Sequence, residues 1–267
     1  MRLAFFALCF GLGVFHAEIR FGHRTATWRA PRAALENATD VFFTGDAGRL
    51  GATRARPPYD DEACLGPPKF LLYLHDAHET RAHPAVRRRA AALRAPPFCY
   101  EVTALDYRGF GDSGGVPDSV AGLAADARVV FRSLRERAPA GVGAVVVYAR
   151  GRLGAAVALA LARRACRRPD PRLAPPTALL LEAAYDARVR PGALDGCSEA
   201  RIFQFHGGGS PTLALGRALA ARIAARPAPA SFLVTPGAGD AAFDAALPAV
   251  GAFLAAGAPA GGGSCPG

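Results

Sequence analysis

The sequence predicts an α/β fold in which helices flank one mainly parallel sheet. Apolar segments of strand length alternate six times with segments of helical periodicity. The strand segments are apolar at consecutive positions, which is typical of parallel strands buried on both faces. The chain has 267 residues, of which 51% are hydrophobic and 20% charged, so it is long and apolar enough for one large domain with a full core.

The expected elements follow from these patterns and from local start signals. Strands are expected at Lys69–His75, Tyr100–Asp106, Val142–Tyr148, Ala178–Leu181, Arg201–Phe205 and Ser231–Thr235. Helices are expected at Pro84–Leu93, from Ser119 to about Arg137, and at Leu153–Arg164, Leu213–Ala225 and Ala241–Leu254. Pro84 suits a first helical turn, and Ser119 suits an N-cap.

The expected domain therefore spans residues 69–255. Residues 18–68 are predicted to be irregular, with strand-like pieces at Ala26–Trp28 and Val41–Thr44, and Trp28 is expected in the core. Residues 256–267 are rich in Gly, Ala and Pro and are predicted to be a disordered tail.

Residues 1–17 are expected to be a signal peptide or a signal anchor. Met1-Arg2 precedes an apolar run from Leu3 to Phe15, and Ala17 precedes a charged residue. Phe15 disfavours cleavage after Ala17, so the anchor remains an alternative. With the sequon at Asn37, this predicts a glycoprotein in the endoplasmic reticulum lumen, associated with its membrane, or secreted.

The cysteines do not indicate a metal centre. Six are present, none with zinc-ligand spacing, and one disulfide is expected among them. No cofactor is expected.

The net charge of +10 comes almost entirely from arginine, because Lys69 is the only lysine. We interpret this as a coding bias rather than a nucleic-acid surface, since no aromatic residues interleave with the arginine runs. The run Arg87–Arg89 is interpreted as a solvated helix face. An anionic membrane surface is a candidate partner.

Polar residues gather where the expected strands end, which is where parallel sheets place their chemistry. The segments are Leu74–His78, Asp106–Gly115, Tyr148–Ala156, Leu180–Tyr185 and Phe205–Gly207. In order and spacing they resemble the α/β-hydrolase superfamily, and most closely its branch of lysophosphatidylserine and monoacylglycerol lipases. The resemblance covers residues 70–254 and implies a serine ester hydrolase with a Ser…Asp…His triad.

The nucleophile expected from this resemblance is missing. The family elbow reads Gly-x-Ser-x-Gly, whereas this chain has Arg150-Gly151-Arg152-Leu153-Gly154. Arg152 therefore takes the nucleophile position, and a guanidinium cannot form an acyl-enzyme. Shifting the alignment by one residue places Gly151 or Leu153 there, and neither is a nucleophile.

The base and the acid are missing as well. The triad histidine follows the last strand in this fold, but no histidine follows His206. The acid position is taken by Ser210, in the sequence His206-Gly207-Gly208-Gly209-Ser210. Because the triad acts as a unit, we expect no triad hydrolysis.

The oxyanion hole depends on backbone N–H groups, here those of Asp76 and Leu153. Asp76 replaces a family glycine, and its carboxylate would oppose a developing negative charge. Tyr185 to Arg201 leaves little room for the family lid.

Other polar residues have structural interpretations. Ser113 is expected to form a turn, and Asp106 to contact Arg108 or the backbone. His75 and His206 are expected to be hydrogen-bonded rather than to bind a metal with Asp76 or Asp240. Arg152 either contacts an anion beside the helix N-terminus or extends into solvent.

Three hypotheses follow. The first is a pseudoenzyme that binds a lipid, an anionic ligand or a partner. The second is an active lipid-ester hydrolase of the resembled family in the endoplasmic reticulum. The third is a decayed or mis-predicted gene product. No nucleic-acid partner is expected, and the oligomeric state stays open.

Overall fold

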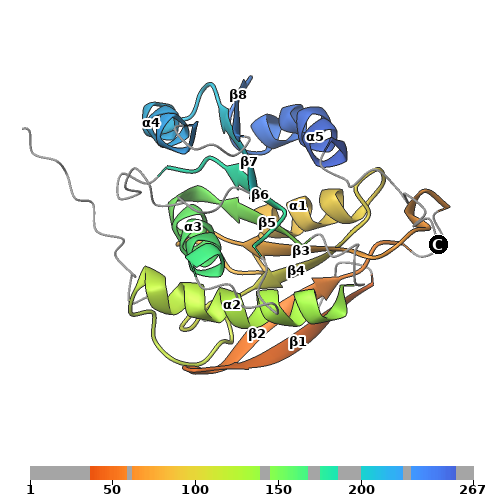
Figure 1. Ribbon diagram of the computed structural model, residues 1–267, viewed down its shortest axis with the longest axis vertical. Helices are drawn as coiled ribbons and strands as arrows, with labels where there is room; N and C mark the ends of the chain where they lie inside the picture. Colours follow the sequence, from red (N-terminus) through yellow and green to blue (C-terminus); the bar gives the residue numbers. More distant parts are fainter. Residues whose placement is uncertain are drawn as a thin grey trace, which may run out of the picture.

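The structure, a computed structural model, describes residues 37–58, 62–138, 145–167, 175–185, 200–224 and 230–256. These residues form an eight-stranded sheet in the order β1-β2-β4-β3-β5-β6-β7-β8, which runs through the molecule in Figure 1. The strands from β3 to β8 are mutually parallel, and β2 pairs antiparallel with both β1 and β4. The expected fold class is confirmed.

Every expected strand is present. The strands are β3 (Lys69–Leu74), β4 (Tyr100–Leu105), β5 (Val145–Arg150), β6 (Ala178–Glu182), β7 (Arg201–Gly207) and β8 (Ala230–Thr235). Central β3 shows why consecutive apolar residues are needed. Leu72 and Leu74 face one hydrophobic cluster, and Leu71 and Tyr73 face the other.

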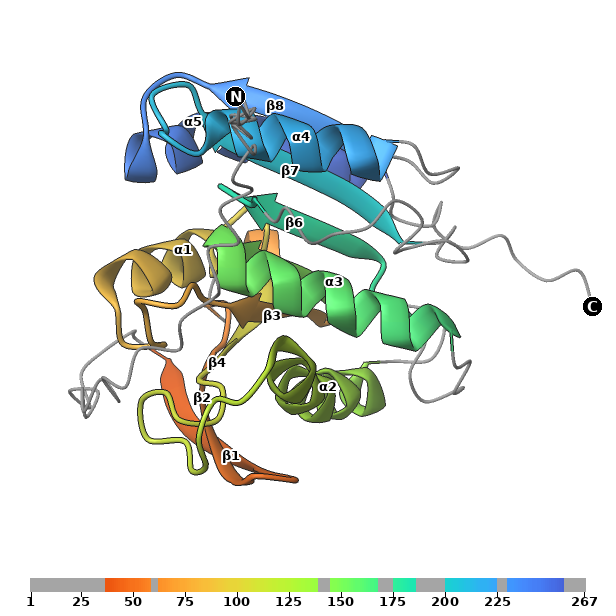
Figure 2. The same cartoon turned by 90° about the vertical axis from the view of Figure 1, so that its left-hand side faces the viewer.

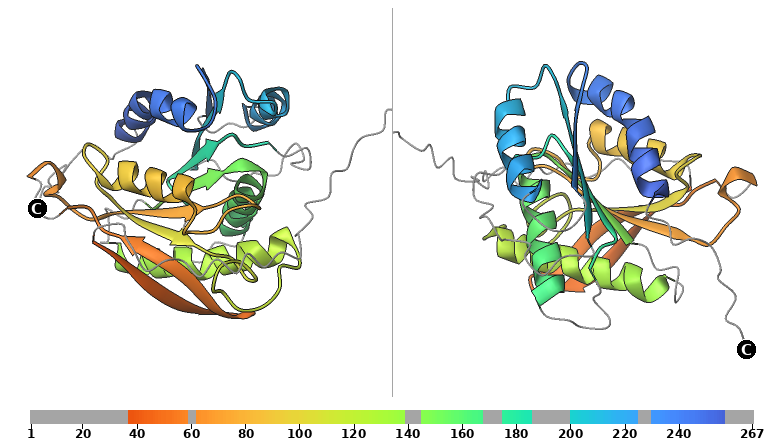
Figure 3. Two further views of the ribbon diagram at one scale, coloured as in Figure 1. Left: turned by 180° about the vertical axis from the view of Figure 1, so that it is seen from behind. Right: turned by 45° about the horizontal axis from the view of Figure 1, so that its top comes forward.

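The five α-helices of the described residues divide between the two faces of the sheet. They are α1 (Pro84–Arg94), α2 (Val120–Arg137), α3 (Gly151–Arg167), α4 (Leu213–Ala224) and α5 (Gly239–Ala255). Helices α2, α3 and α4 cover one face, and α1 and α5 cover the other, as the rear and tilted views in Figure 3 also show. Ser119 caps α2 as expected, because its Oγ accepts a hydrogen bond from Gly122 N–H at 3.0 Å.

The sheet begins earlier than expected, so the boundary at residue 69 is wrong. Residues predicted to be irregular contain β1 (Ala38–Gly45), β2 (Gly48–Ala55) and a 3₁₀ turn at Glu62–Cys64. Figure 2 shows this hairpin at the edge of the sheet opposite β8. The strand-like piece at Val41–Thr44 lies within β1, whereas the one at Ala26–Trp28 lies outside the described residues.

Other predictions also fall outside the described residues. These are the leader at 1–17, the tail from residue 257 onward, and most of the segment between β6 and β7. Within the described part, no helix combines the length and the apolar character needed to cross a bilayer.

Two of the described cysteines form a disulfide that joins the approach to β3 with the start of β4. Cys64 and Cys99 lie with their Cα atoms 5.3 Å apart. Cys166 on α3 is disulfide-bonded as well, so the expectation of a single disulfide is too low.

We predict that replacing both Cys64 and Cys99 with alanine lowers the free energy of unfolding by about 2–4 kcal/mol. The bond closes a loop of 35 residues, and its loss frees the unfolded chain. Denaturant unfolding measures the effect, and non-reducing peptide mapping of the wild type is the control. Unchanged stability, or free thiols at both positions in the mapped wild type, would contradict this prediction.

Candidate functional site

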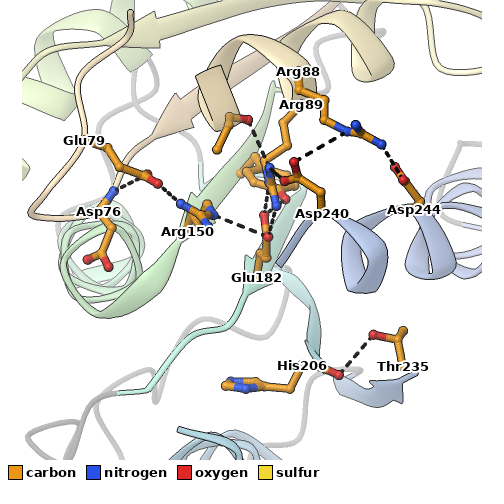
Figure 4. Close-up of polar contacts among 12 residues, drawn as sticks. Asp76, Glu79, Arg88, Arg89, Arg150, Glu182, His206, Thr235, Asp240 and Asp244 are labelled. Atoms are coloured by element: carbon orange, nitrogen blue, oxygen red, sulfur yellow. Dashed lines mark hydrogen bonds and ion pairs between the residues drawn. The ribbon is translucent and has the colours of Figure 1, made fainter. Parts of the chain in front are cut away.

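The candidate site lies at the carboxyl edge of the parallel strands, where the resemblance places it. The ends of β3, β5 and β6 meet there, with the start of α5 beside them, as the close-up in Figure 4 shows. Several of the contacts at this edge are ion pairs.

The turn from β5 to α3 is as tight as the family elbow. The residue with a left-handed backbone in this turn is not Arg152, the expected nucleophile position. Strand β5 ends at Arg150 and α3 begins at Gly151, so no loop residue separates them. Gly151 has φ of 65°, in the left-handed region, and Arg152 does not share it. A serine hydrolase carries its nucleophile on the strained residue of this turn. By backbone conformation the nucleophile position is therefore Gly151, which corrects the placement at Arg152.

Close packing explains why this turn also needs Gly154. A Cβ built on Gly154 would lie 2.5 Å from the carbonyl oxygen of Leu74. Helix α3 thus presses its first turn against the end of β3, and any side chain at residue 154 would push the two apart.

Arg152 lies one residue further along, in the first turn of α3, and its side chain is half-buried. Burial and the Asp76 carboxylate raise the pKa of the Tyr185 hydroxyl, and the Arg152 charge opposes them. Arg152 and Asp76 therefore both act electrostatically on Tyr185.

Both backbone donors that the sequence predicted for the oxyanion hole are already bound, although with Gly151 at the nucleophile position the donor after it would be Arg152 N–H. Leu153 N–H donates to Oδ1 of Asp76 at 3.0 Å. Asp76 N–H donates to Oε2 of Glu79 at 3.2 Å. The Asp76 carboxylate also lies against Gly151, because a Cβ there would be 2.2 Å from its Cγ and Oδ2. The expected donors are thus both bound by carboxylates of the same chain.

A series of ion pairs begins at Glu79, next to Asp76, and continues to Asp240 at the start of α5. Arg150 pairs with Glu79 and lies 3.4 Å from Oε1 of Glu182. Arg89 binds Glu182 through two hydrogen bonds of 2.5 Å. Arg89 also donates to Asp240 at 2.8 Å. The pairs are drawn in Figure 4.

Arg89 is fully buried, which corrects the interpretation of Arg87–Arg89 as a solvated face. Burial alone would lower the pKa of its guanidinium, but hydrogen bonds to Glu182 and the charge of Glu182 raise that pKa above its usual value. The Tyr148 hydroxyl donates a hydrogen bond to the same carboxylate. Arg89 also stacks on Phe243, with its Cζ 4.8 Å from the ring centroid.

His206 at the end of β7 and Ser210 at the expected acid position both make structural contacts. His206 is buried, and its Nε2 bonds the carbonyl oxygen of Ala184 at 2.9 Å. Burial lowers the pKa of this imidazole. The ring also packs against Gly216, where a Cβ would lie 2.2 Å from Nε2. Ser210 accepts a hydrogen bond from Thr212 N–H at 3.3 Å, beside the start of α4.

His75 is likewise held inside the fold. Its Nδ1 is 2.8 Å from the carbonyl oxygen of Asp76, and its ring packs against Tyr107 and Phe110. Among the described residues no cluster of His, Cys, Asp and Glu could hold a metal ion.

The loop that follows β4 is held by ion pairs, but not between the expected partners. Asp106 pairs with Arg81 at 2.9 Å instead of with Arg108. Arg108 pairs with Asp126 at 2.7 Å. Ser113 donates to the carbonyl oxygen of Asp106 at 2.7 Å, in the turn-forming role expected of it.

The arrangement and its likeness to solved structures define the class of protein. An α/β serine hydrolase from Xanthomonas campestris, named as one without a lid, superposes with a TM-score of 0.62 at 18% identity, covering 88% of this chain and 100% of that one. An α/β hydrolase from Vibrio vulnificus gives 0.60 at 19%, covering 82% and 81%. Brefeldin A esterase, a bacterial homologue of human hormone-sensitive lipase, gives 0.60 at 18%, covering 88% and 82%. The chain therefore has the α/β-hydrolase fold.

The curated relatives within that class are lysophosphatidylserine lipases named ABHD12. The chain is 35% identical over 127 residues to the Rattus norvegicus protein, covering 48% of this chain and 29% of the relative. It is 35% identical over 116 residues to the Danio rerio protein, covering 43% and 28%. The match therefore spans less than a third of the length of these relatives. No protein-family model matches the chain.

Sequence reasoning missed Glu79, Arg89 and Glu182 as members of the site. Glu182 carried a usable signal, because it is a charge at the end of an apolar strand that faces the site edge. Arg89 carried none, because its partners come from β6 and α5.

We predict that Arg89→Ala lowers the free energy of unfolding by about 3–5 kcal/mol, because it leaves the buried Glu182 carboxylate without its guanidinium. Arg88→Ala is the matched control, since Arg88 is the neighbouring arginine with a side chain 52% exposed. The control should lose at most about 1 kcal/mol. Equal losses in the two variants, measured by denaturant unfolding, would refute the buried role of Arg89.

Proposed function

We propose that this chain is a non-hydrolysing α/β-hydrolase-fold protein, related to the lysophosphatidylserine lipases, that acts by binding. The observation that carries the proposal is the elbow itself. Its strained residue is Gly151, which has no side chain, and the neighbouring Leu153 N–H is bound by Asp76. The absence of any histidine after His206 adds a second, independent reason.

The binding part of the proposal rests on Arg152 and on the relatives. Arg152 is a half-buried cation in the first turn of α3, and its charge opposes the rise that burial causes in the pKa of the Tyr185 hydroxyl. The ligand class we propose is an anionic lipid whose phosphate pairs with this guanidinium, because the named relatives act on lysophosphatidylserine. An anionic membrane surface presents the same headgroup chemistry.

We place this protein in the secretory pathway, in the endoplasmic reticulum lumen, at its membrane or secreted. The disulfides support this location, because such bonds persist in oxidising compartments. Asn37 is exposed, so its sequon is accessible to glycosylation.

A fluorophosphonate probe tests the absence of triad chemistry. We expect no labelling of the wild type, and no ester turnover from either Gly151→Ser or Arg152→Ser, because neither change supplies a base. An active serine hydrolase labelled in parallel is the control. Labelling at a serine, together with turnover that is lost when that serine is replaced, would overturn the proposal.

Thermal unfolding in the presence of lysophosphatidylserine tests the binding role. We expect a higher Tm for the wild type and no rise for Arg152→Ala, because binding to the native state stabilises it. Arg163→Ala is the matched control, an exposed arginine on the same helix, and it should respond like the wild type. No rise in the wild type, or equal rises in all three proteins, would exclude binding through Arg152.

A further inference from the structure

We infer that the Asp76 carboxylate is a built-in occupant of the elbow, seated where a nucleophile side chain on residue 151 would lie and bound to the first turn of α3. This inference goes beyond the proposed function, because it holds whether or not Arg152 binds a lipid. It rests on the contacts of Asp76 with the elbow and on what holds Asp76 in place.

The first contact occupies the hydrogen-bond donor. Leu153 N–H, in the first turn of α3, donates to Oδ1 of Asp76 at 3.0 Å. The first N–H groups of a helix have no partner within the helix, and the helix dipole favours a negative charge beside them. The carboxylate meets both conditions and satisfies this donor from within the chain.

The second contact occupies the space of the nucleophile. A Cβ built on Gly151 would lie 2.2 Å from both Cγ and Oδ2 of Asp76. No side chain fits on residue 151 until the carboxylate moves. The space that a nucleophile side chain would need at residue 151 is therefore the space that the Asp76 carboxylate fills.

Neighbouring charges hold Asp76 in this position. Its own N–H donates to Glu79, and Glu79 is buried and paired with Arg150. The backbone of Asp76 is thereby fixed at the end of β3, so its short side chain reaches the elbow without a large loss of freedom. Because the carboxylate is tethered, it competes with free anions at a high effective concentration.

The test removes the Asp76 carboxylate by substitution and supplies a free carboxylate in solution. Asp76→Gly deletes a CH₂–COO⁻ group, and acetate has the same carboxylate on one methyl. We expect acetate to give a saturable rise in the Tm of Asp76→Gly and no such rise in the wild type, with chloride at equal ionic strength as the reference. Glu136→Ala is the matched control for the lost charge, since Glu136 is exposed on α2, and it should behave like the wild type.

A folded Asp76→Gly whose Tm does not respond to acetate would overturn the inference, as would equal rises in all three proteins. If Asp76→Gly does not fold, Asp76→Ala with formate gives the same comparison, because the group deleted is then a single carboxylate. Neither measurement involves Arg152 or a lipid. The inference about Asp76 therefore stands or fails independently of the proposed lipid binding.

Discussion

The hydrogen bond from Leu153 N–H to Asp76 depends on how tightly β5 turns into α3. No loop residue separates the two elements, so the left-handed conformation falls on Gly151. Gly154 lets the helix approach the carbonyl of Leu74, which brings the end of β3 under the first helical turn. The Leu153 N–H in the first turn of α3 therefore faces residue 76. In a hydrolase this arrangement receives the substrate, and here it receives a carboxylate.

The charged residues around this turn form a network of ion pairs, which also fixes the geometry of the site. Arg150 and Arg89 lie between the carboxylates of Glu79, Glu182 and Asp240. Buried pairs of this kind contribute little net stability, but removing one partner leaves an uncompensated charge in the core. The network therefore fixes the geometry of the site edge. Its arginines are held by two or more acidic partners at the ends of β5 and β6.

The parallel part of the fold could be predicted because burial on both faces leaves a continuous apolar run in each strand. The hairpin of β1 and β2 could not, because β2 carries two glycines and two arginines within eight residues and gains its order from pairing with β4. The prediction that the triad base is missing rests on the positions of the histidines alone. The burial of Arg89 was not, since Glu182 lies 93 residues and Asp240 151 residues away along the chain. The shift of the elbow from Arg152 to Gly151 needed a backbone angle, which no residue pattern supplies.

Amide hydrogen exchange at Leu153 tests the central claim most directly. A helix N–H without an acceptor exchanges quickly, whereas one bound to a carboxylate is protected. The account predicts slow exchange at Leu153 in the wild type and fast exchange in Asp76→Ala, with unchanged protection in β5. Fast exchange in the wild type, or equal rates in both proteins, would show that Asp76 does not occupy the site.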